Sequence, residues 1–69
     1  MEKEVMLRKW IQKHKALINE APDKTQRDYL VMMWVGFLNG LRVSNAISWN
    51  DYNSLYKEIQ EFAVGVEAA

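Results

Sequence analysis

The ten residues from Tyr29 to Leu38, YLVMMWVGFL, decide how this chain folds. They are almost continuously apolar, but a membrane-spanning helix needs about 20 such residues, so we expect the run in a protein core. A helix that is apolar on nearly every side is usually contacted by neighbours on more than one face. The run therefore predicts a central hydrophobic helix, which helices from the flanking sequence should cover.

A proline separates this central helix from the sequence before it. Pro22 blocks continuation of a preceding helix and is suited to the first turn of the next one. Two residue pairs are candidates for the N-terminal cap of the central helix: Asp23 with Gln26, or Thr25 with Asp28. Both alternatives start the helix within the same turn.

The C-terminal end of the central helix has two interpretations. We expect the helix over residues 24 to 44, with Asn45 as the left-handed residue that ends it. The competing interpretation ends the helix at Asn39, because the pair Asn39 and Gly40 is an equally good stop signal.

Amphipathic helices are expected on both sides, over residues 3 to 20 and 49 to 64. In each segment apolar residues recur at steps of three and four, which places them in one stripe along a helix. Ser48 and Asp51 resemble a capping box at the start of the last helix, and Gly65 is expected to end it. The first stripe consists of Met6, Leu7, Trp10, Ile11, Leu17 and Ile18. The second consists of Trp49, Tyr52, Leu55, Tyr56, Ile59, Phe62 and Ala63.

These three segments and their short connections predict a single all-α domain, a three-helix bundle with antiparallel neighbours.

The composition also excludes several classes of function. The 69 residues include no cysteine, which excludes disulfides, thiolate nucleophiles and cysteine-based zinc sites, and one histidine cannot form a multi-histidine metal site. We therefore expect no enzyme, cofactor or metal. The charged start, MEKEVMLRK, does not resemble a signal peptide, and we expect a cytoplasmic protein without a membrane span.

His14 is the only histidine, and it lies within the first apolar stripe between Ile11 and Ile18. Catalysis would need a nucleophile or a carboxylate beside it, and the sequence nominates neither. We expect a partly buried side chain that is hydrogen-bonded to a carbonyl or a tyrosine hydroxyl.

Gly36 and Gly40 are four residues apart and therefore share one face of the central helix. The first interpretation is a notch that seats an aromatic side chain from another helix of the same chain. The second is the seam of a dimer, by analogy with the small-xxx-small pattern of membrane helices. If the helix ends at Asn39, Gly40 is only part of a cap.

Surplus aromatic and methionine residues are the strongest functional signal, because these residue types are favoured at protein interfaces. Trp34 lies about 160° around the helix from Gly36, so the central helix has two apolar faces. One face should meet the flanking helices and leave the other for a protein partner or a second copy. The candidate interface residues are Leu30, Trp34, Leu38 and Leu41.

Charge is unevenly distributed along the chain and supports an alternative. Residues 1 to 27 hold seven positive and four negative charges, a net charge of +3, although the whole chain is neutral. The alternative is an accessory nucleic-acid-binding protein, although a solvated helix face explains the same residues and nucleic acid is the less favoured partner. Its candidate phosphate contacts are Arg8, Lys9, Lys13 and Lys15.

One segment resembles a known sequence pattern. The stretch from Leu38 to Tyr56, LNGLRVSNAISWNDYNSLY, is similar to the helix junctions of small uncharacterised helical proteins from Gram-positive prophages and mobile elements. The matching positions are Asn45, Ala46, Ile47, Ser48, Asp51 and Tyr52. The resemblance implies a helix-to-helix junction and a phage or mobile-element origin, and it transfers no functional residue.

Overall fold

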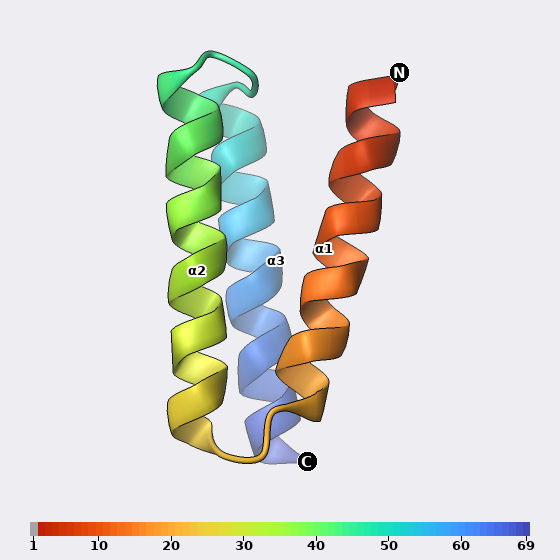
Figure 1. Cartoon of the computed structure of the whole chain (residues 1–69), viewed down its shortest axis with the longest axis vertical. Helices are drawn as coiled ribbons and strands as arrows, with labels where there is room; N and C mark the ends of the chain where they lie inside the picture. Colours follow the sequence, from red (N-terminus) through yellow and green to blue (C-terminus); the bar gives the residue numbers. More distant parts are fainter. Residues whose placement is uncertain (1) are drawn as a thin grey trace.

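The computed structural model describes residues 2–69 and contains three helices (Figure 1). They are α1 (Glu2–Glu20), α2 (Lys24–Val43) and α3 (Trp49–Ala68). Each helix packs against both of the others, and the described residues contain no strand. The predicted all-α three-helix bundle is confirmed. None of the helices within residues 2–69 combines the length and the hydropathy that a membrane-spanning segment requires.

Side-chain caps fix where α2 and α3 begin. The Asp23 carboxylate accepts a hydrogen bond from the Gln26 amide at 2.9 Å, which selects one of the two cap alternatives for α2. The Ser48 hydroxyl accepts one from the Asp51 amide at 3.1 Å, as the capping box predicts for α3. Each cap satisfies an amide that has no partner within its helix.

The end of α2 agrees with the longer interpretation, since the helix runs through Gly40 to Val43. Asn45 has φ 60°, in the left-handed region, as expected for the residue that ends a helix. The end of α3 differs from the prediction, because the helix continues through Gly65 to Ala68. A glycine costs only about 1 kcal/mol in a helix interior, which does not by itself end the helix.

The core lies where the three helices meet. Its buried side chains are apolar, and they come from every helix and from the connection between α2 and α3. They are Leu7, Ile11, Ile18, Trp34, Leu38, Ile47, Leu55, Ile59 and Ala63. Part of the expected α1 stripe stays outside the core: Met6, Trp10 and Leu17 are 39–46% exposed. Figure 1 gives the reason for the N-terminal half, because α1 diverges from α2 toward its N-terminus.

Candidate functional site

The side of α2 that faces away from the core carries no charge. No residue between Asp28 and Arg42 has a charged side chain, which leaves about 20 Å of helix without one. Several large apolar side chains of this stretch and of the adjoining turn are nevertheless exposed, from 37% for Phe37 to 85% for Val43. We call this surface the outer face of α2. Its members are Tyr29, Met32, Met33, Gly36, Phe37, Gly40 and Val43.

The two glycines of α2 lie at the middle of the outer face. At 100° per residue, Tyr29, Gly36 and Gly40 fall within about 40° of one another. A Cβ atom added at Gly36 or Gly40 would meet nothing within 4 Å. The prediction that this notch seats an aromatic side chain of the same chain is therefore wrong, because neither α1 nor α3 covers this side of α2.

The four residues predicted to form the interface lie in the core or against it, so this prediction is also wrong. Trp34 is 2% exposed and Leu38 is fully buried, while Leu30 and Leu41 are partly buried against the core. Both α1 and α3 pack on the side of α2 that carries these four residues, so it forms the core. The helix does have two apolar faces, but the uncovered one is the glycine side.

A groove between α1 and α2 adjoins the outer face and has a volume of about 290 Å³. Met33 and Phe37 belong to both surfaces. Across the groove, the ring of Trp10 meets that of Phe37 edge to face, with 5.0 Å between the centroids and 79° between the planes. Its lining residues are Trp10, Lys13, His14, Leu17, Met33, Trp34 and Phe37. The exposed apolar surface therefore continues from α2 onto α1.

His14 lines this groove and links α1 to α2. Its Nε2 lies within hydrogen-bond distance of the Leu30 carbonyl oxygen, so this nitrogen carries the proton and donates it. The imidazole also lies 5.2 Å from the Trp34 ring, measured between centroids. The expectation of a partly buried histidine bonded to a carbonyl is confirmed. Within residues 2–69, no group of three or more His, Cys, Asp or Glu side chains is arranged to hold a metal ion.

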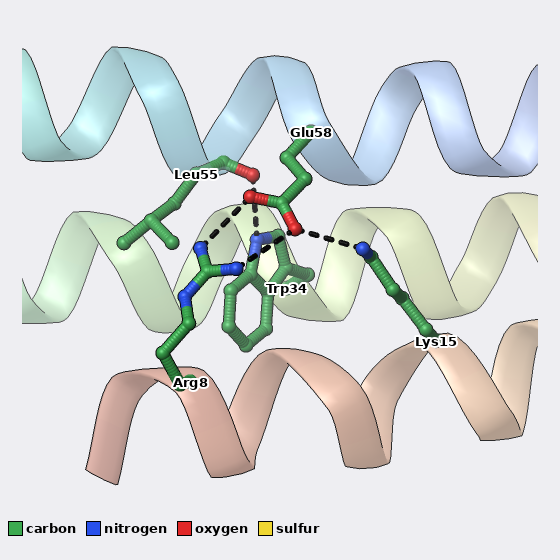
Figure 2. A network of polar contacts seen from close by, with 5 residues as sticks. All are labelled: Arg8, Lys15, Trp34, Leu55 and Glu58. Atoms are coloured by element: carbon green, nitrogen blue, oxygen red, sulfur yellow. Dashed lines mark hydrogen bonds and ion pairs between the residues drawn. The ribbon is translucent and has the colours of Figure 1, made fainter. Parts of the chain in front are cut away.

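A cluster of three charged side chains joins α1 to α3 (Figure 2). Arg8 donates two hydrogen bonds to the Glu58 carboxylate, at 2.8 and 3.2 Å, and Lys15 donates one at 2.7 Å. These bonds, Arg8's first, lower the pKa of Glu58 from 4.5 to about 2. The hydrogen bond from Arg8 to Glu58 in turn raises the pKa of Arg8 above its usual value.

This cluster divides the four candidate phosphate contacts. Arg8 and Lys15 are paired with Glu58, whereas Lys9 and Lys13 are exposed on α1. The structure therefore does not bring the four cations together as one free basic patch. Two of them instead link α1 to α3 through Glu58.

The sequence interpretation missed the residues that form the exposed surface. Tyr29, Met32, Met33 and Phe37 were visible as members of the apolar run, but nothing in their pattern told the covered side of α2 from the open one. The signal that marks the outer face is the absence of charge at its exposed positions, which becomes meaningful once the packing of α1 and α3 is known.

The chain matches no protein-family model, no curated protein and no solved structure. The resemblance of its helix junction to prophage proteins stays a prediction.

Proposed function

We propose that this chain is a small, non-enzymatic protein-interaction module, which docks the outer face of α2 on an apolar surface of another protein molecule. One observation carries the proposal: the exposed side of α2 is apolar and uncharged over about four turns, between Asp28 and Arg42. Contiguous exposed apolar surface of this kind marks interaction sites, whereas single exposed apolar residues are ordinary. Placement of the protein in the cytoplasm is part of the same proposal.

The composition of the outer face supports a protein partner in particular. Methionine and aromatic residues are enriched in protein interfaces and charged residues are depleted at their centres. Met32 and Met33 supply flexible side chains that adapt to a partner, and Tyr29 and Phe37 supply large rigid ones. A phosphate-binding surface would instead need exposed Lys and Arg side chains.

Site-specific cross-linking in cells of the native host tests the proposal. A photoreactive amino acid is placed at position 33, on the outer face, and at position 5 as the matched control. Val5 is 58% exposed on α1 and lies in a different surface region, beside Arg8 and Lys9. We expect a defined protein adduct from position 33 only. Adducts that form equally from both positions, or from neither, would contradict the proposal.

The cross-linked protein is then purified and titrated with the full chain. An apolar interface should retain its affinity between about 50 and 200 mM salt, whereas phosphate-driven binding falls steeply over this range. Met33→Glu should abolish binding and Val5→Glu should leave it unchanged. A steep salt dependence, with loss of binding in a Lys9→Gln and Lys13→Gln double variant, would favour the nucleic-acid alternative instead.

A further inference from the structure

We infer that the occupant of the outer face of α2 is a second copy of this chain, bound with the two α2 helices antiparallel and in close contact at Gly36. This inference rests on the proposed function and names the partner of the same surface.

The charge pattern favours a copy over a different partner. The outer face itself presents no charged group for which a partner could supply the opposite charge, although Lys13 lines the adjoining groove, and the whole chain carries no net charge. Two copies can therefore approach without long-range repulsion, and on the outer face charge gives a different protein no advantage over a second copy. The antiparallel arrangement also sets the positive N-terminal end of each α2 beside the negative C-terminal end of the other.

The shape of the outer face complements itself under a twofold rotation. With the axis at the level of Gly36, the two Gly36 residues meet, and Met32 of each copy is level with Gly40 of the other. Tyr29 is then level with Val43 of the second copy. Side chains that are 61–85% exposed would thus pack beside glycines or beside each other. The open space at both glycines lets the two backbones approach closely.

The outer face and the adjoining groove together approach the area of a standard dimer interface. The five exposed side chains of the outer face contribute on the order of 500 Å² per copy, against roughly 800 Å² per partner in a standard interface. Trp10 and Leu17, on the α1 side of the adjoining groove, supply further apolar surface. The single chain also exposes 4928 Å², more than the roughly 4500 Å² expected for a compact monomer of 8.1 kDa.

Sedimentation equilibrium of the full chain, from micromolar to millimolar concentration, tests the inference. We expect reversible association to twice the 8.1 kDa mass of one chain. A species that stays monomeric throughout this range overturns the inference. If position 33 still cross-links to a different protein, the proposed function survives that result, and if it does not, both fall.

Two glycine variants locate the interface. Gly36→Ala and Gly65→Ala both replace a helical glycine whose added Cβ meets nothing within 4 Å, so both should raise the thermal stability of the monomer. Only Gly36→Ala adds a methyl group where the two helices would meet, and it should raise the dimer dissociation constant about tenfold or more. Equal dissociation constants for the two variants overturn close contact at Gly36.

A charge variant tests whether the dimer uses the outer face even if the two helices are not in close contact at Gly36. Met33→Glu would bring two like charges into the interface, and we expect at least a hundredfold weaker association. Val5→Glu, at an exposed α1 position outside the outer face, is the control and should associate like the unmodified chain. Dimers that persist in Met33→Glu, or that are lost in Val5→Glu, overturn the assignment of the dimer to this face.

Discussion

The indole Nε1 of Trp34 donates a hydrogen bond to the backbone carbonyl oxygen of Leu55 at 3.2 Å, inside the core (Figure 2). The bond joins α2 to α3 and satisfies the only polar atom of a side chain that is 2% exposed. The bond can form only when the side of α2 that carries Trp34 faces the core, which is also the side of the buried Leu38. The glycine side of α2 is left outward as a result.

Trp34→Phe should lower the free energy of unfolding by about 2 kcal/mol, through the lost hydrogen bond and the smaller buried ring. Urea denaturation followed by far-UV circular dichroism measures the change. Trp49→Phe is the control: Trp49 is 62% exposed and stacks under Arg42 at 4.5 Å, so its replacement should cost less than about 1 kcal/mol. A larger loss from Trp49 than from Trp34 would contradict the burial of Trp34 in the core.

Glu58→Gln should lower the free energy of unfolding at neutral pH by about 1 kcal/mol, a modest value because the partner Arg8 is more than half exposed. The charged form of Glu58 is favoured in the folded chain, so its contribution is present above the ordinary pKa of 4.5 and disappears as the pH falls through about 2. The difference between the two proteins should therefore close over that window in denaturation experiments at a series of pH values.

Glu61→Gln is the matched control for Glu58. Glu61 lies 3.8 Å from Lys57 on the surface of α3, and both side chains are more than two-thirds exposed. Its replacement should change the free energy of unfolding by less than about 0.5 kcal/mol. Equal effects at the two positions would show that the link from α1 to α3 contributes nothing beyond an ordinary surface pair.

Ser48→Ala should cost about 1 kcal/mol, since it removes the acceptor of the Asp51 amide at the start of α3. Ser54 is exposed and lies away from the ends of the same helix. Ser54→Ala should be neutral or slightly stabilising, because alanine is the better helix former. Thermal unfolding of both variants distinguishes a cap from a general preference for serine. A stable Ser48→Ala protein would mean that α3 does not depend on this cap.

Asn45→Ala should destabilise the chain by about 1 kcal/mol, because a residue with a Cβ and no polar side chain is strained at φ 60°. Asn45→Gly should be as stable as the unmodified chain or slightly more stable, since glycine adopts this conformation freely. Asn39→Ala, at an exposed helical position in α2, should be stabilising by a few tenths of a kcal/mol. The free energy of unfolding in urea provides the comparison, and a loss in Asn45→Gly would contradict the expected order.

The fold could be predicted from the sequence because its determinants are local. Asp23 and Ser48 accept from amides three residues ahead, and Asn45 ends α2 through its own backbone conformation. Local patterns also showed the buried residues of α1 and α3, although Met6, Trp10, Leu17 and Trp49 of the predicted stripes are exposed. The end of α3 was wrongly predicted at Gly65, because one glycine costs too little to end a helix by itself.

The outer face could not be predicted in the same way, because it depends on packing between helices. Gly36 and Trp34 lie on opposite sides of a helix that is apolar on both sides. Periodicity alone therefore does not show which of the two sides is buried. The hydrogen bond from Trp34 to Leu55 and the two cations on Glu58 involve partners between 21 and 50 residues apart in the chain. No spacing rule within one helix shows such pairs.

The short connections at residues 21–23 and 44–48 have a kinetic consequence. They let each helix pack against the next by closing only a small loop, and helical bundles of this kind fold within about microseconds to milliseconds. Two proteins at micromolar concentration meet productively about 0.1–10 times per second, at association rate constants of roughly 10⁵–10⁷ M⁻¹s⁻¹. The core around Trp34 is thus closed long before any partner arrives. Binding at the outer face is therefore an encounter between folded molecules, with a rate that is set by their concentration.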